Sequence, residues 1–169
     1  MLHIKIIFFF SMICVLLSVK VVYADELGKE SLKGLNGVYL IVERLNPDIE
    51  KDGLTKNSIK TAVELKLRMA GIKVLTKEEI FKDPDSPVLH VQVVSIKERT
   101  IDSFYAIGIN IELYQHVFLI RDKSIIFHTA TWCDKLVVMR LAKEVYSLKD
   151  VIKDRIDEFI NDYLAVNPK

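Results

Sequence analysis

The sequence predicts an α+β domain: a two-layer sandwich in which a mixed five-stranded sheet packs two helices on one face. Three observations predict it. A helical stretch lies between two short β-branched runs in the first half, three strands follow, and an amphipathic stretch closes the chain. Each helical stretch has one polar face, so both helices are expected on the same side of the sheet.

The first half predicts a strand–helix–strand unit. Residues 37–42 form a short apolar run, and a turn follows at 46–48. Thr55 is a candidate N-cap for a helix whose apolar residues recur at spacings of three and four, and Gly71 is typical of the C-terminal end of a helix. Residues 72–75 form the second strand. A right-handed crossover would make the two strands parallel.

The second half begins with a short helical turn and continues with strands. Thr76 and Glu79 have the spacing of a capping box. Strands are expected over residues 88–96, 105–121 and 125–134, all antiparallel to their neighbours. Residues 136–145 are ambiguous and are interpreted as a loop with possible helix. Residues 148–164 form the clearest amphipathic helix of the chain.

The pairing of the last two strands decides which side chains share a face. A two-residue turn would place Glu112 opposite Cys133 and would mix apolar and polar faces. A three-residue turn over residues 122–124 pairs Leu113 with Cys133 and keeps apolar residues together, so we expect that register. Cys133 would then lie on the core face as a buried, unreactive thiol.

In that register the opposite face collects aromatic and imidazole rings. Tyr114 faces Trp132, and Phe118 faces His128, with His116 between them. Aromatic side chains with polar tips on an open sheet are typical of an interaction surface, so these five residues are the candidate partner-binding site. Two structural alternatives remain: ordinary cross-strand aromatic pairing, or burial of this face under residues 136–145.

The amino terminus predicts export. Residues 1–24 have a positive start, an apolar core and small side chains before Asp25, which is typical of a secretory signal peptide cleaved near Ala24. The alternative is an uncleaved membrane anchor. Residues 25–34 are expected to be a flexible leader and residues 35–169 a single domain. The mature protein would be periplasmic or secreted.

The charge balance and the absence of known motifs argue against several classes of function. Residues 25–169 carry 22 bases against 23 acids, a near-neutral balance that does not favour nucleic acid or anionic lipid. Membrane contact is therefore not predicted. Cys133 is the only cysteine after the leader, so no internal disulfide can form. Metal-ligand spacings, phosphate-binding glycine patterns and nucleophile elbows are absent from the sequence, so no metal and no cofactor are expected.

Three segments carry a resemblance. The sequences LNGVYLIVE (35–43), LKLRMAGIKVL (65–75) and FINDYL (159–164) resemble a group of short exported bacterial proteins without assigned activity. The element order is also similar to the N-terminal domain of the periplasmic propeller protein of the Tol-Pal system and to periplasmic domains of curli-secretion-type outer-membrane proteins. The resemblance implies an envelope assembly or binding module, on analogy of fold alone.

These observations favour a non-enzymatic periplasmic binding or adaptor protein, whose partner is an envelope protein or a small apolar ligand. One alternative is a small hydrolase that uses His116, His128 and a carboxylate pair formed by Glu112 and Asp134. Another is a soluble carrier for a small apolar ligand. A deep pocket around the histidines would favour the enzyme or the carrier, and a flat open face would favour the adaptor.

Overall fold

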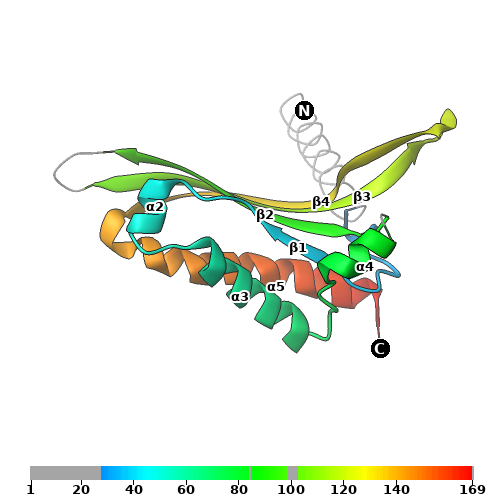
Figure 1. Cartoon of the computed structure of the whole chain (residues 1–169), viewed down its shortest axis with the longest axis horizontal. Helices are drawn as coiled ribbons and strands as arrows, with labels where there is room; N and C mark the ends of the chain where they lie inside the picture. The colour runs from blue at the N-terminus through cyan, green and yellow to red at the C-terminus, as the bar shows by residue number, and fades with distance from the viewer. Residues whose placement is uncertain (1–27, 84, 99–102, 169) are drawn as a thin grey trace, which may run out of the picture.

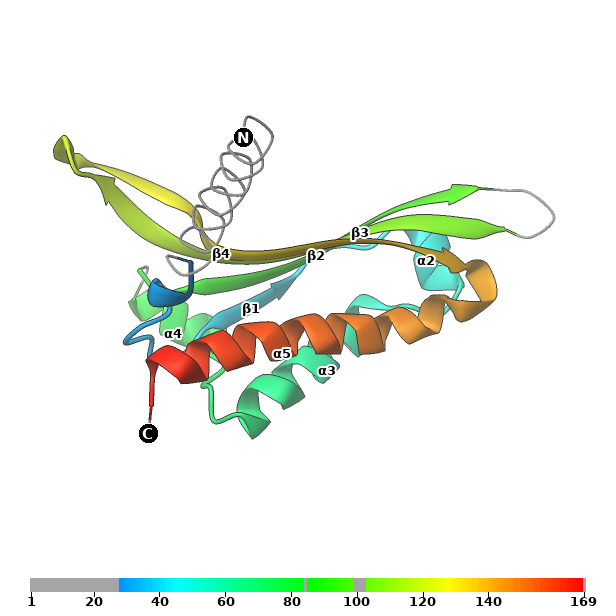
Figure 2. The same cartoon turned by 180° about the vertical axis from the view of Figure 1, so that it is seen from behind.

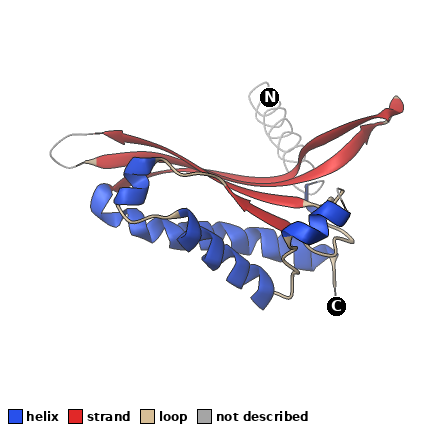
Figure 3. Cartoon of the chain, viewed as in Figure 1, coloured by secondary structure: helices blue, strands red, loops and turns tan. Residues whose placement is uncertain are grey.

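The computed structural model describes residues 28–83, 85–98 and 103–168, so the expected signal peptide lies outside the described residues. Two long helices lie side by side under one face of a sheet, and two of its strands continue as a projecting hairpin (Figures 1 and 3). The elements, in chain order, are β1 (Tyr39–Val42), α2 (Pro47–Lys51), α3 (Lys56–Met69), α4 (Lys77–Lys82), β2 (Val88–Glu98), β3 (Phe104–Leu119), β4 (Asp122–Leu141), the 3-10 helix η1 (Ala142–Ser147) and α5 (Leu148–Val166).

The sheet is mixed, as expected, but the prediction of five strands and two helices was wrong. The described residues form four strands in the order β1-β2-β3-β4 and five complete helices. Residues 72–75 make only one parallel bridge, from Val74 to Val38, because the chain turns into the cap of α4 at Thr76 directly afterwards. β1 and β2 pair in parallel, and the other two pairs are antiparallel.

The sequence predicted where α3 and α4 begin, but it did not predict α2. Thr55 caps α3 and Thr76 caps α4, each through a hydrogen bond to the third backbone N–H of its helix. The sequence predicts a turn at residues 46–48, where the structure has the short helix α2. It begins with Asn46 as N-cap and Pro47 in the first helical turn, a combination that starts helices as readily as it ends strands.

The core lies between α3, α5 and one face of the sheet (Figure 2). In β3 every second residue from Tyr105 to Leu113 is buried, which confirms the alternation expected for this strand. The helices contribute buried residues at spacings of three and four: Ile59, Val63 and Leu67 from α3, and Leu148, Ile152, Ile156, Phe159 and Ile160 from α5.

Residues 28–34 pack against this body, although the segment from residue 25 was expected to be a flexible leader. Leu32 is fully buried, and the backbone N–H of Gly34 donates to Asn167 Oδ1 over 2.7 Å. The carbonyl oxygen of Ser31 accepts from Gln115 Nε2 over 3.1 Å. The start of the described chain is thus held to both β3 and the end of α5.

The register between β3 and β4 differs from the expected one. Leu113 pairs with Trp132 and Glu112 with Cys133, whereas Tyr114 pairs with Ala130. Thr131 is therefore an extra residue on β4, a β-bulge that shifts the register by one. The two-residue-turn register holds on one side of it and a different register on the other. The expected register was wrong because it assumed one register along the whole length of β3 and β4.

Residues 136–141, interpreted as a loop, are the end of β4. At its other end, β3 and β4 extend beyond β2, whose first residue, Val88, pairs with Tyr114. Residues 115–130 therefore form a two-stranded hairpin that projects from the body (Figure 1, upper right).

Candidate functional site

The face of the sheet that points away from α3 and α5 is the candidate site, and we call it the open face. It displays every second residue of β3, from Ala106 to Phe118, with the neighbouring residues of β2 and β4. Because three long strands run through it, side chains far apart in the sequence form cross-strand rows. The rows change in chemistry along the strands.

At the hairpin end of the open face, four rings form a cluster. Tyr114 stands edge-on to His90, with ring centroids 5.7 Å apart, and lies 5.4 Å from His128. His128 in turn lies 5.0 Å from His116, its direct partner across β3 and β4. We call His90, Tyr114, His116 and His128 the ring cluster.

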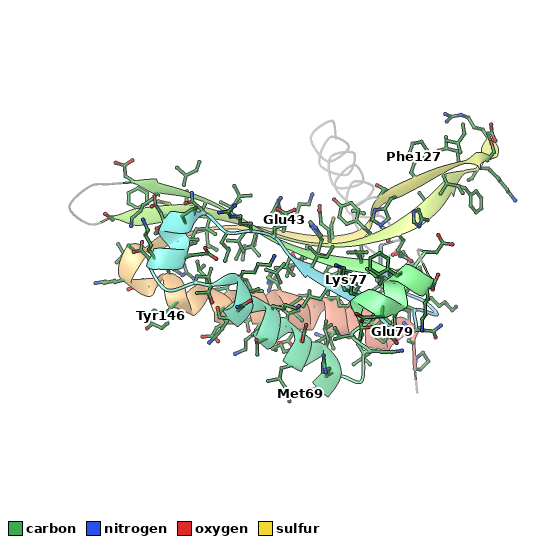
Figure 4. The ribbon with its side chains drawn as sticks, in the orientation of Figure 1. Glu43, Met69, Lys77, Glu79, Phe127 and Tyr146 are labelled. Carbon is green, nitrogen blue, oxygen red and sulfur yellow. The ribbon has the colours of Figure 1, made fainter. Side chains whose placement is uncertain are left out.

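Carboxylates surround the ring cluster. His116 Nδ1 lies 3.1 Å from Asp85 Oδ1, and His90 Nδ1 lies 3.4 Å from Glu43 Oε1 (Figure 4 labels Glu43). The hydroxyl of Tyr114 donates to Glu112 over 3.0 Å. Three of the four rings therefore face an acceptor, whereas His128 faces other rings.

These contacts shift the pKa values of several groups, among them Glu112 and His128. The hydrogen bond from Lys135 Nζ, 2.8 Å from Glu112 Oε1, and that from Tyr114 hold the pKa of Glu112 below its usual value, against the opposing effect of burial. Partial desolvation, with the positive charge that His116 and His90 can carry, lowers the pKa of His128. Glu112 is therefore a fixed negative charge, and His128 favours its neutral form.

At the opposite end, the open face is apolar. Val94 pairs with Gly108, which pairs with Val137, and the next row consists of Ile96, Ala106 and Met139. The outer residues are well exposed, up to 78% for Val137. Among the described residues, and apart from its two chain neighbours, no atom lies within 4 Å of the position where a Cβ on Gly108 would be. We call these six residues the apolar patch: large apolar side chains on β2 and β4 border two small residues of β3.

The structure brings together four of the five residues that the sequence singled out. Tyr114, His116 and His128 belong to the ring cluster, and Phe118 continues the same face onto the hairpin. Trp132 does not join them. It lies on the core face, 6% exposed, because the bulge at Thr131 turns it toward α5. The expected pairing of Tyr114 with Trp132 was wrong for the same reason.

Two further expectations need correction. Cys133 is exposed on the open face opposite Glu112, not buried in the core. Asp134 does not pair with Glu112, because it lies opposite Ile111 on the core side, 3.6 Å from Arg155. The carboxylate pair that the hydrolase hypothesis requires is therefore not formed. Within the described ranges, no three His, Cys, Asp or Glu side chains are grouped so as to hold a metal ion.

The helical side of the molecule carries a groove. A groove of about 930 Å³ runs between α3 and α5. Leu65 and Met69 line it as exposed apolar side chains (Met69 is labelled in Figure 4), and an ion pair between Lys66 and Asp157 crosses it. None of the ring-cluster residues lines this groove.

No family model matches the chain, and no curated protein matches it. Solved structures similar to this chain at low identity include a lipoprotein and a PelC variant. A minor lipoprotein from Acinetobacter baumannii is 13% identical, with 77% of this chain and 93% of that chain covered and a TM-score of 0.42. A dodecameric PelC variant from Paraburkholderia phytofirmans is 14% identical, with 78% and 92% covered and a TM-score of 0.43. These values are too low to carry a conclusion about function.

Among the helices that the structure describes, none combines the length and apolar character needed to cross a bilayer.

Proposed function

We propose that this chain is a non-enzymatic binding or adaptor protein of the bacterial envelope, which contacts its partner through the open face. The signal-peptide pattern of residues 1–24 supports an exported location, periplasmic or secreted. The apolar patch carries the proposal, because two adjacent cross-strand rows of exposed aliphatic side chains form a contiguous surface. Such surfaces on soluble domains mark sites of interaction.

The chemistry of the open face suits one partner surface better than a small substrate. The apolar patch supplies burial, and the ring cluster with Glu112 and Lys135 supplies directed polar contacts at the other end. Protein interfaces combine buried apolar area with directed hydrogen bonds, and the open face offers both. The ring cluster holds hydrogen-bonding groups on an open sheet, which favours recognition over catalysis.

The test is site-specific photo-crosslinking in cells that express the full chain. A photoreactive amino acid at Val137 is expected to give a discrete adduct with a partner, whereas the same amino acid at Leu65 on α3 is not. Leu65 is a matched control because it is also an exposed aliphatic residue, on the helical side. Equal adducts at both positions, or none at Val137, would contradict the proposal.

Cys133 supplies a second readout on the same face. Its thiol is exposed next to Glu112, so a maleimide is expected to label it in the native protein and Cys133→Ser to remain unlabelled. Once the crosslinked partner is known, its addition should slow labelling at Cys133. Unchanged labelling in the complex would place the contact elsewhere.

A carrier for a small apolar ligand is a second candidate, favoured by the groove between α3 and α5. Its volume lies in the range of small-molecule sites, and exposed Leu65 and Met69 give it an apolar lining. Titration with a fluorescent fatty acid would test it: enhanced emission that Met69→Lys abolishes supports a carrier, and no enhancement contradicts it.

A further inference from the structure

We propose that the end of the β3–β4 hairpin inserts into the surface of an anionic phospholipid bilayer. This inference goes beyond the proposed function and does not rest on it, because the apolar patch that carries the proposed function lies at the opposite end of β3. We call residues 118–127 the hairpin tip. They lie at the far end of the projecting hairpin, on which Figure 4 labels Phe127.

The hairpin tip exposes large apolar side chains on both of its faces. Phe118 pairs with Ile126 on one face, and Phe127 lies on the other face opposite Val117. Ile120, at the turn, is 93% exposed, the highest value among the exposed large hydrophobic residues. The exposed apolar side chains of the tip are Phe118, Ile120, Ile125, Ile126 and Phe127.

The two-sided arrangement favours lipid over a protein partner. A protein surface covers one face of a hairpin and leaves the other in water. A lipid interface surrounds an inserted element on all sides, so it removes both apolar faces from water together. The open face of the body differs, because its other side is covered by α3 and α5.

The charges at the tip complement a phosphate-rich surface. Arg121 lies in the turn and Lys123 near the start of β4, and in the described part of the chain neither has a carboxylate within ion-pair distance. The intervening Asp122 is held by Ser124, whose N–H and hydroxyl both donate to Asp122 Oδ1, over 3.0 and 2.7 Å. Basic side chains beside an apolar tip bind anionic lipid headgroups.

Backbone chemistry limits the depth of insertion. Beyond Tyr114 each strand of the hairpin pairs only with the other, so the outer N–H and C=O groups need water or headgroups as partners. The tip therefore enters only the interfacial region, to a depth of about 5–10 Å. The ring cluster and the apolar patch remain outside, free for a protein partner.

The test uses the protein purified from cells that express the full chain. An Ile120→Trp variant reports on the tip itself, since the native Trp132 is buried and its emission can be subtracted as the wild-type spectrum. We expect a blue shift with vesicles of phosphatidylethanolamine and phosphatidylglycerol, and a much smaller shift with phosphatidylcholine vesicles or at high salt. A shift that needs no vesicles and grows with protein concentration would instead indicate a second copy as the occupant, and overturns the proposal.

Vesicle co-sedimentation supplies the second measurement. Ile120→Ser and Phe127→Ser are each expected to weaken binding about tenfold or more, and neutralising Arg121 and Lys123 together with glutamine about fivefold or more. Tyr146→Ser, at an exposed aromatic residue of η1 outside the tip, the open face and the groove, is the control and should bind as the wild type does. Tip variants that bind as tightly as the wild type, with no shift at position 120, would overturn the proposal.

Discussion

Trp132 packs edge-on against Phe159, with ring centroids 5.1 Å apart, and its Nε1 donates to Asp162 over 3.0 Å. It joins β4 to α5 through both an aromatic contact and a hydrogen bond. Trp132→Ala should therefore lower the free energy of unfolding by about 3–5 kcal/mol. Urea denaturation followed by circular dichroism measures the loss. Phe118→Ala, a control on the exposed hairpin, should change it by about 0.5 kcal/mol or less.

The fluorescence of the native protein checks the same placement without a mutation. A buried indole emits at short wavelength and resists quenching by iodide. Red-shifted, readily quenched emission would contradict the burial of Trp132, and with it the bulge at Thr131.

Asp52 makes stability depend on acidity. Lys97 Nζ and the buried hydroxyl of Tyr105 both donate to Asp52 Oδ2 over 2.6 Å, and these two bonds hold the pKa of Asp52 below its usual 3.8. The ionised form is thus favoured in the folded state. Its contribution to stability is complete above the usual value and is lost as pH falls through the lower folded-state value.

Asp52→Asn tests this linkage. Urea midpoints of the variant and the wild type should differ most near neutral pH, and the difference should shrink below pH 3.8. Asp154→Asn, on the exposed side of α5, should show no comparable pattern. A constant difference at all pH values would show that Asp52 acts through packing alone.

Among the elements, the link between β1 and residues 72–75 depends on a close backbone approach. A Cβ on Gly37 would lie 2.7 Å from the carbonyl oxygen of Lys73, which accepts from the N–H of Val38 over 2.9 Å. Gly37→Ala should destabilise the fold by about 1–3 kcal/mol, since backbone must move to admit the methyl group.

Gly108→Ala is the matched control for that change. Gly108 lies in β3, where the backbone is extended and an added Cβ would meet no atom of another described residue within 4 Å, its chain neighbours apart. Thermal unfolding of the two variants should show a large fall in melting temperature for Gly37→Ala and little change for Gly108→Ala. Similar falls for both would mean that glycine at position 37 is not required by the contact with Lys73.

Elements whose ends are set by neighbouring residues could be predicted from the sequence, whereas those set by distant contacts could not. The caps at Thr55 and Thr76 and the stop at Gly71 involve neighbours within a few residues, and all three were correct. The bulge at Thr131 is settled by non-local packing: Trp132 gains the core beside Phe159, and Gln115 Nε2 donates to Thr131 Oγ1 over 2.7 Å. No pattern in the sequence around Thr131 predicts the bulge.

The sequence predicted part of the candidate site and missed the apolar patch. The alternation of β3 placed Tyr114, His116 and Phe118 on one face without knowledge of its partners. The apolar patch was missed because residues 136–139 are apolar on both faces of β4, so that Val137 and Met139 do not stand out from Leu136 and Val138. An alternating pattern is visible in sequence only where one face is polar.

On the scale of the whole molecule, stability and exposure are distributed unevenly. The body is a sheet of which one face is covered by α3 and α5 (Figure 1). Among the described residues, only β4 pairs with β3 in the hairpin beyond Tyr114, and Ser31 contacts the base of the hairpin at Gln115 and Thr131. The open face and the hairpin tip thus belong to one sheet. The sheet is packed against helices behind the open face of the body, whereas the tip depends on the pairing of two strands.

This difference predicts two levels of protection from hydrogen exchange. Amides of β3 between Tyr105 and Leu113 lie in a strand paired on both sides and packed on the core, so they should exchange only through global unfolding. Hydrogen-bonded amides of residues 115–119 can exchange when the hairpin opens alone. Their opening free energy should be about 3 kcal/mol or more lower, roughly a hundredfold in exchange rate. Native-state exchange in low urea, followed by mass spectrometry of peptides, separates the two. A single protection level across β3 would mean that body and hairpin unfold as one unit, and that the hairpin is supported by contacts beyond its own strand pairing.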